Sequence, residues 1–294
     1  LVRSRGLGDV YKRQGRDDSL FRRLIDEGDA PDAPRRVLVE EQGDRAIITL
    51  CEPERLNVLS APLVRQLRRA VADLSESPDI RTIILTGAGP GFCAGGDLQM
   101  MDTALGYLDA AEGTTDMWRW IRREFGAIAR TIAGADTIFV AALNGPAAGV
   151  GLAWALTCDI TLASDRAVIV PAFGRLGLLP EVGTTWALTR RLGYQGALSY
   201  FLRGEHLDAW QAKEIGLVQE VVDHDQLLAA ADDWASRVAA LPTHTTAMVK
   251  PLLRAGADAS WHDGLTLEEF AEPSCFSTQN FATAVRATMS RRGH

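Results

Sequence analysis

Two segments rich in glycine and alanine, each placed directly after an apolar run, most constrain the fold of this chain. Phe92 to Leu98 (FCAGGDL) follows the run from Thr82 to Thr86, and Asn144 to Gly151 (NGPAAGVG) follows the run from Ile138 to Leu143. Such runs predict buried strands, and a helical pattern follows each segment. Backbone N–H groups in turns of this kind can approach a ligand closely, so a pair of them can hold one oxyanion.

Strand and helix patterns alternate along most of the chain, which predicts an α/β fold with a parallel sheet covered by helices. A hairpin is predicted over 37–50, and Ser60 is predicted to cap a helix whose apolar face runs from Leu63 to Leu74. Beyond residue 226 the pattern is that of amphipathic helices, interrupted near Pro242, Gly256 and Pro273. Further strands are predicted over 79–86, 159–163 and 218–222, and further helices over 118–133, 150–157, 184–192, 197–202 and 208–215.

These patterns divide the chain into four parts. Residues 1–14 (LVRSRGLGDVYKRQ) have no helical or strand period and resemble a translated sequencing adapter, so they are left out of the fold. Residues 15–36 form a charged, proline-containing extension, residues 37–225 the core, and residues 226–294 a helical region. If the first segment is foreign, the native start is expected upstream, and any targeting signal would be lost with it.

Composition excludes several classes of function. The formal net charge of −7 disfavours a nucleic-acid partner, because an acidic surface repels phosphate backbones. No apolar run approaches the roughly 20 residues that span a bilayer, so we expect no membrane partner. The four cysteines and five histidines lack the spacing of metal ligands, so we expect no metal site. Reduced, buried thiols suit a cytoplasmic protein better than a disulfide framework does.

The two glycine segments, together with residues 170–185 (VPAFGRLGLLPEVGTT), resemble the crotonase (enoyl-CoA hydratase/isomerase) superfamily over roughly 36–292. The resemblance implies a ββα spiral core and a C-terminal helical region that assembles homotrimers or hexamers. It also implies that the peptide N–H groups of Gly96 and Val150 stabilise a thioester enolate. The substrate would be an acyl-CoA that carries its own coenzyme A, with no separate cofactor.

Glu181 follows Pro180 at the start of a predicted helix. Taken alone, it is one of many acidic residues near helix starts. In superfamily members that act as Δ3,Δ2-enoyl-CoA isomerases or as ring isomerases of phenylacetate catabolism, a carboxylate follows the proline of this turn, which implies that Glu181 is a base. Typical hydratases carry two glutamates at positions that are Ala153 and Phe173 here. Hydration needs both a base and an acid, so the sequence disfavours it.

Further residues are assigned to substrate binding by the same resemblance. Arg55 and Asn57 match the segment that contacts the adenosine end of CoA, where a guanidinium suits a phosphate or the adenine. Asn57 could equally cap a turn, and Asp97 could cap the next helix. Trp118 and Trp120 are predicted either to line the acyl pocket or to pack in the core behind their helix. Phe125 is predicted to pack in the core. The residues assigned to CoA-thioester binding are Arg55, Asn57, Ala94, Gly95, Asp97, Leu98, Gly149, Pro171, Phe173 and Leu176.

The sequence therefore predicts an isomerase that shifts the double bond of a 3-enoyl-CoA to the 2-position through a dienolate, with Glu181 as base and acid. Two alternatives stay open. One is other enolate chemistry, such as epoxide-ring isomerisation or an atypical hydratase. The other is a non-catalytic acyl-CoA-binding subunit. RNA binding, known for a few superfamily members, is disfavoured by the acidic charge.

Overall fold

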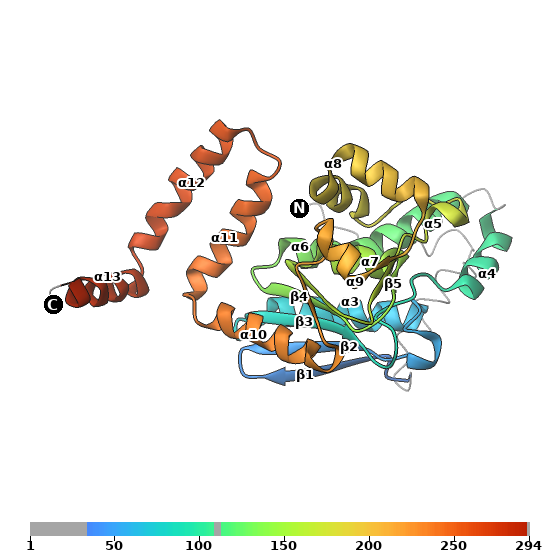
Figure 1. Cartoon of the computed structure of the whole chain (residues 1–294), viewed down its shortest axis with the longest axis horizontal. Helices are drawn as coiled ribbons and strands as arrows, with labels where there is room; N and C mark the ends of the chain where they lie inside the picture. The colour runs from blue at the N-terminus through green and yellow to red at the C-terminus, as the bar shows by residue number, and fades with distance from the viewer. Residues whose placement is uncertain (1–33, 109–112, 293–294) are drawn as a thin grey trace, which may run out of the picture.

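A six-stranded sheet forms the centre of the molecule (Figure 1). The computed structural model describes residues 34–108 and 113–292, so the predictions for 1–14 and 15–33 lie outside the described residues. The strand order is β1-β2-β3-β4-β6-β9, and all pairs except β1–β2 are parallel. The predicted α/β class is confirmed. The strands are β1 Val37–Gln42, β2 Arg45–Leu50, β3 Thr82–Gly87, β4 Ile138–Leu143, β6 Ile160–Ser164 and β9 Glu220–Val222.

The predicted hairpin and the helix after it are confirmed. β1 and β2 pair antiparallel, and alternate β2 residues are fully buried, as expected for a strand with one face on the core. Helix α3 (Ala61–Glu76) begins after Ser60, whose side chain accepts a hydrogen bond from the Leu63 N–H at 3.4 Å. The apolar face of α3, from Leu63 to Leu74, packs into the main hydrophobic core.

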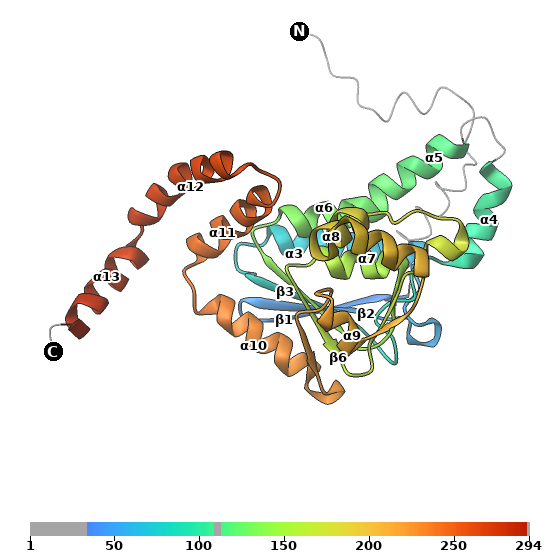
Figure 2. The same cartoon turned by 45° about the horizontal axis from the view of Figure 1, so that its top comes forward.

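Helices cover both faces of the sheet (Figure 2). The face that carries Ile48, Ile83 and Leu85 belongs to the main core, which also holds the buried sides of α3, α6 (Gly126–Gly134) and α7 (Gly149–Thr157). The other face is covered by α10 (Leu227–Ala239), which buries a smaller cluster. This cluster consists of Ile84, Val140, Ala142, Leu162, Leu227 and Ala231.

Strands β3 and β4 are neighbours and parallel, so their carboxyl ends lie at the same edge of the sheet. The two glycine segments follow these ends and meet there. Their backbones pair at Cys93 and Ala147, and the Ala148 N–H donates to the Cys93 carbonyl at 2.9 Å. The fold thus brings together two turns that are about 50 residues apart in the chain.

A second, three-stranded sheet was not predicted. It is formed by β5 (Ala147–Ala148), β7 (Val168–Val170) and β8 (Leu207–Asp208), in the order β5-β7-β8. Strands of two or three residues have too little alternation to be seen as a pattern. This sheet sets the segment after β7 beside the second glycine segment, because β5 and β7 are parallel.

The remaining helices of the core follow the predictions with two irregularities. The helix predicted over 118–133 is formed by α5 (Gly113–Trp120) and α6, joined by a π-helical segment at Ile121–Phe125. The two helices predicted over 184–202 are merged as α8 (Thr184–Arg203), with a kink at Gly193 between them. Helix α4 (Leu98–Leu108) follows the first glycine segment, and α9 (Ala209–Glu214) is capped by Asp208.

The tail is helical, as predicted, and extends from the rest of the molecule (Figures 1 and 2). It consists of α11 (Thr243–Gly256), α12 (Trp261–Phe276) and α13 (Gln279–Arg292). The breaks near Pro242 and Gly256 are confirmed, but the break near Pro273 is wrong. Pro273 lies inside α12, where its helical φ is compatible with continuation although one hydrogen bond is lost. In the described ranges, no helix combines the length and apolar character needed to cross a bilayer.

Candidate active site

The first glycine segment holds one peptide group in a fixed orientation. The Leu59 N–H donates to the Gly95 carbonyl at 2.8 Å. In a trans peptide the C=O and the following N–H point in opposite directions, so the Gly96 N–H is directed away from Leu59. Gly95 has φ +87°, and a Cβ there would lie 2.9 Å from the Ala148 carbonyl oxygen, so only glycine allows this approach of the two turns.

The second glycine segment supplies a helix start. Val150 lies in the first turn of α7, after the N-cap Ala148, and the first N–H groups of a helix have no acceptor within it. The Asn144 side chain ties this segment to the loop before the first one, because its amide donates to the Gly89 carbonyl at 2.9 Å and its oxygen accepts from the Gly87 N–H at 3.1 Å. The two segments are joined directly by the hydrogen bond from the Ala148 N–H to the Cys93 carbonyl. The peptide groups of Gly96 and Val150 thus belong to two turns that are fastened to each other.

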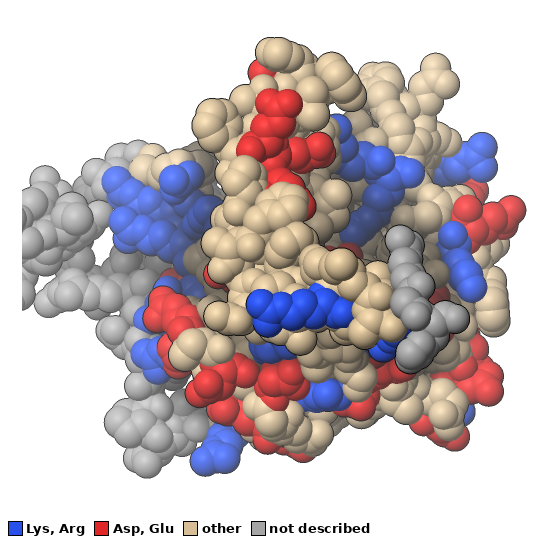
Figure 3. All heavy atoms as spheres, turned by 90° about the vertical axis from the view of Figure 1, so that its left-hand side faces the viewer, with Lys and Arg blue, Asp and Glu red and all other residues tan. Residues whose placement is uncertain are grey.

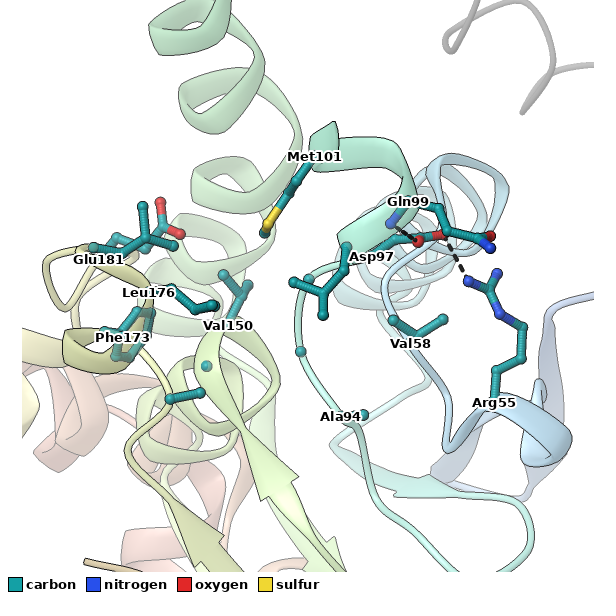
Figure 4. Close-up of a pocket in the computed structure, with 16 residues that line it drawn as sticks. Arg55, Val58, Ala94, Asp97, Gln99, Met101, Val150, Phe173, Leu176 and Glu181 are labelled. Carbon is teal, nitrogen blue, oxygen red and sulfur yellow. Dashed lines mark hydrogen bonds and ion pairs between the residues drawn. The ribbon is translucent and has the colours of Figure 1, made fainter. Parts of the chain in front are cut away.

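Both peptide groups border a cavity of about 460 Å³ (Figure 4). The first glycine segment and the start of α4 form one side of it, and the segment after β7 forms the other. Most of the wall is apolar, and the carboxylates among its lining residues are Asp97 and Glu181. The lining residues are Arg55, Val58, Ala94, Gly95, Gly96, Asp97, Leu98, Gln99, Met101, Gly149, Val150, Ala172, Phe173, Leu176, Leu178 and Glu181.

Glu181 lines the cavity on the side of Phe173 and Leu176, across from Asp97 and Arg55 (Figure 4). Its backbone is fixed by Thr184, whose N–H and hydroxyl both donate to the Glu181 carbonyl, at 3.0 and 2.7 Å. Burial raises the pKa of the Glu181 carboxyl above its ordinary value, because desolvation disfavours the charged form. A carboxyl group with a raised pKa is a stronger base than an ordinary glutamate, which suits it to accept a proton from a carbon atom and to return it.

Comparison with known proteins shows which family this chain belongs to. The enoyl-CoA hydratase/isomerase family model matches residues 40–292. The chain belongs to the enoyl-CoA hydratase/isomerase family. It is 32% identical to a 1,2-epoxyphenylacetyl-CoA isomerase from Escherichia coli, over 83% of this chain and 92% of that protein. It is 31% identical to a probable enoyl-CoA hydratase from Mycobacterium bovis, over 87% of this chain and 95% of that protein.

Solved structures agree with this assignment. A putative enoyl-CoA hydratase from Streptomyces coelicolor superimposes with a TM-score of 0.81 at 28% identity, over 89% of this chain and 95% of that one. The crotonase fold predicted from the glycine segments is therefore confirmed, and the chain is a member of an enzyme family. Relatives named as hydratases and as a ring isomerase both occur, so the family alone does not decide the reaction.

Most of the predicted site residues of this family member line the cavity, and two do not. Asn57 is fully buried, and its side chain shapes the turn after β3 instead of contacting the cavity. Its amide donates to the carbonyls of Gly91 and Ala88 at 2.8 and 3.0 Å, and its oxygen accepts from the Glu52 N–H at 2.8 Å. Pro171 is also buried and outside the lining. The turn-capping alternative therefore describes Asn57 better than a substrate contact does.

Arg55 lies at the cavity with its side chain 39% exposed, and its guanidinium is paired with Asp97 at 3.1 Å (Figure 4). Asp97 also caps α4, since its other oxygen accepts from the Gln99 N–H at 3.0 Å. This confirms the predicted cap. The ion pair joins the segment after β2 to the first glycine segment, so an anionic ligand that binds Arg55 competes with Asp97 for it.

Neither position that carries a glutamate in typical hydratases offers a carboxylate here. Ala153 is fully buried within α7 and does not line the cavity. Phe173 does line it, with its ring largely buried beside Leu176 and Ala172. Two carboxylates line the described cavity. Asp97, on the opposite side, is paired with Arg55, so Glu181 is the carboxylate without an ion-pair partner among the described residues.

Five lining residues were missed by sequence reasoning. They are Val58, Gln99, Met101, Ala172 and Leu178. Met101 was detectable, because a residue four positions after the N-cap Asp97 lies on the same helix face. Its terminal methyl packs so closely over Gly96 that a Cβ on Gly96 would lie 2.2 Å from it. Met101 therefore covers the space between the first glycine segment and Glu181 (Figure 4).

Of the three aromatic residues singled out in the α5–α6 region, two are buried in the core and one is exposed at the surface. Trp120 and Phe125 are buried and meet edge to face at 6.3 Å, which confirms the prediction for Phe125 and gives Trp120 the core alternative. Trp118 is exposed, with Arg122 over its ring. None of the three lines the cavity.

Cys93, within the first glycine segment, is a buried thiol. Burial raises its pKa to about 12, so this thiol is not a nucleophile.

Proposed function

We propose that this enzyme is an acyl-CoA thioester isomerase that moves the double bond of a 3-enoyl-CoA to the 2-position. The observation that carries the proposal is that one carboxylate without an ion-pair partner, Glu181, lines the same described cavity as the peptide groups of Gly96 and Val150. One carboxylate suffices for a 1,3-proton shift, whereas hydration in the usual mechanism needs a positioned water and two carboxylates.

The proposed reaction has two proton transfers. Glu181 removes a proton from C2, and the electron pair delocalises onto the thioester oxygen and the C3–C4 double bond to give a dienolate. The N–H groups of Gly96 and Val150 stabilise the oxyanion, and the α7 start adds a favourable dipole. The protonated Glu181 then delivers the proton to C4, which restores the thioester and leaves the double bond between C2 and C3. No water, oxidant or additional cofactor is consumed.

A second candidate is other enolate chemistry, in particular the isomerisation of an epoxide ring. The observation that favours it is the 32% identity to a protein named 1,2-epoxyphenylacetyl-CoA isomerase. Both reactions would use the same oxyanion-binding peptides. A non-catalytic acyl-CoA-binding subunit is the remaining alternative, and turnover of any enoyl or epoxy substrate by the purified protein excludes it.

Isomerisation should be much faster than hydration, and deuterated water separates the two. With a 3-enoyl-CoA we expect a 2-enoyl product without the added mass of water. Little deuterium should enter that product, because one shielded carboxylate carries the proton. With a 2-enoyl-CoA we expect very slow formation of 3-hydroxyacyl-CoA, because Phe173 and Ala153 offer no second carboxylate. Mass spectrometry measures both products. Hydration at the rate of isomerisation would contradict the single-base mechanism.

We further propose that the tail assembles a homotrimer or a hexamer. The tail extends from the core and exposes large apolar side chains, with Trp261 81% and Phe270 82% exposed. Figure 3 shows broad uncharged areas on the face that includes the tail. Exposed apolar surface of this kind marks an interaction site.

The assembly can be tested by light scattering coupled to gel filtration. The wild-type chain should elute with a mass of three or six protomers. Phe270→Asp should lower that mass, because a charge at a buried interface position is strongly unfavourable. Val39→Asp, which places the same charge at an exposed site on β1, serves as the matched control and should leave the mass unchanged. A monomeric wild-type chain would refute the proposal.

A further inference from the structure

The turn that carries Glu181 contains an unusual backbone conformation. Val182 has φ +56°, in the left-handed region, and the next residue, Gly183, has φ +87°. Glycine adopts such angles freely, but a β-branched residue does so only against steric resistance. Among the non-glycine residues of the described chain, positive φ occurs at Leu56, Asn57 and Val182, and Val182 is the β-branched one.

The side chain of Val182 explains why the conformation persists. It is half-buried and packs against the main hydrophobic core. It also lines a second cavity, of about 400 Å³, together with Leu156, Thr157 and Ala187. Glu181 lines the active-site cavity and not this one. Two consecutive residues of the turn therefore line different cavities, and the backbone between them is left-handed at Val182.

A strained residue persists where the surrounding structure determines its conformation, and such residues cluster at active sites. Here the packing of Val182 and the two hydrogen bonds from Thr184 to the Glu181 carbonyl hold the turn from both sides. If Val182 relaxed to a negative φ, the turn would rotate, and either Val182 would leave the core or Glu181 would leave the cavity wall.

We propose that Val182 is a positioning residue, whose core-anchored side chain and left-handed backbone hold the Glu181 carboxylate at the wall of the active-site cavity. The proposal rests on the proposed function for the role of Glu181 as a base. Glycine at this position would adopt the positive φ without strain, but it has no side chain to pack against the core. The valine therefore supplies an anchor that glycine lacks.

The charged groups around the turn lie on both sides of it. Across the active-site cavity are Arg55 and Asp97, which are paired with each other. Across the second cavity are Arg130, Arg254 and Asp258. Burial is the cause that raises the pKa of Glu181, so the titration of this carboxyl reports how well water is kept from it.

The test compares Val182→Gly with the wild type by titration of the glutamate carboxyl carbons in ¹³C NMR. The Glu181 resonance is assigned by its loss in Glu181→Gln. We expect Val182→Gly to lower the pKa of Glu181 toward the ordinary value, because a released turn exposes the carboxyl to water. The kcat/KM for 3-enoyl-CoA should fall at least tenfold, with KM changed less than kcat, since a misplaced base affects the chemical step.

Ala187→Gly is the matched control. Ala187 is buried, lies in α8 and lines the same second cavity, so loss of its methyl group destabilises the helix while its N–H keeps the 2.9 Å hydrogen bond to the Gly183 carbonyl of the turn. It should lower the melting temperature and leave both the pKa of Glu181 and kcat/KM unchanged. If Val182→Gly does not fold by circular dichroism, Val182→Ala, which loses most of the anchor, takes its place with the same expectations.

Unchanged titration and unchanged kcat/KM in a folded Val182 variant would overturn the proposal, and so would an equal response of Ala187→Gly. The NMR titration does not depend on turnover. A wild-type enzyme without isomerase activity would therefore refute the proposed function, while a pKa that responds to Val182→Gly would still establish the positioning role.

Discussion

Glu181→Gln should lower the rate of 3-enoyl-CoA isomerisation by about 10²–10⁴, the usual contribution of a general base. The amide keeps the shape of the side chain but cannot accept the C2 proton, and the described cavity wall offers no other unpaired carboxylate to replace it. The loss should appear in kcat, while the affinity for a saturated acyl-CoA, measured by calorimetry, should change little. Turnover near the wild-type level would eliminate Glu181 as the base.

The pH dependence follows from the same carboxyl. Only ionised Glu181 can remove a proton, so kcat/KM should decline as the pH falls through the pKa of Glu181. That decline should lie above the pH at which an ordinary glutamate titrates, because burial raises this pKa. It should be absent from the residual activity of Glu181→Gln.

The free energy of unfolding should depend on pH in the opposite sense to kcat/KM. A carboxyl whose pKa is raised on folding favours the folded state at low pH, and this contribution is lost as the pH rises through the folded-state pKa. At neutral pH the buried charge opposes folding, so Glu181→Gln should melt no lower than the wild type. A marked loss of melting temperature would show that the carboxylate makes a stabilising contact.

The sequence predicted the part of the fold that depends on local patterns. Runs such as Ile138 to Leu143 are short, apolar and bounded by glycine segments, so their strand character does not depend on distant contacts. The cap at Ser60 and the apolar face of α3 are equally local. Because β3 and β4 are parallel neighbours, these local predictions also place the two glycine segments together.

Features that depend on distant contacts were not predictable in this way. The second sheet exists because Ala147–Ala148 and Val168–Val170 find each other in the folded chain, although each strand is too short to stand out. In this case tertiary contacts override the local signal. Pro273 differs, because it is exposed and α12 continues past it where a sequence pattern places a break.

The candidate site shows the same division. Glu181 and the two glycine segments were found from motif resemblance, and the structure brings them to one cavity. Asn57 was assigned to substrate, but its amide is used up by backbone carbonyls of the turn after β3. Met101 was missed although its spacing from Asp97 places it on the same helix face, and its contact with Gly96 depends in addition on the direction of α4. Motifs thus locate residues of the cavity wall better than they separate candidate substrate contacts from the residues that support the turns.

Val150→Pro should slow isomerisation by about 10²–10³, equivalent to about 2.7–4 kcal/mol of barrier, as for the loss of one oxyanion donor. Proline removes the N–H group, and the first turn of a helix tolerates it because no intrahelical hydrogen bond is lost there. Gly96→Pro removes the other N–H and should slow the reaction at least as much, because its Cβ would also lie 2.2 Å from the Met101 methyl group.

Val150→Ala is the control for this change, since it shortens the side chain and keeps the N–H. It should retain most of the activity, so that the difference in kcat between the alanine and proline variants isolates the hydrogen bond. Circular dichroism must show an intact fold for each variant. The oxyanion develops in the dienolate, so the loss should fall on kcat more than on KM. A folded Val150→Pro enzyme with the turnover of Val150→Ala would mean that this peptide does not stabilise the oxyanion.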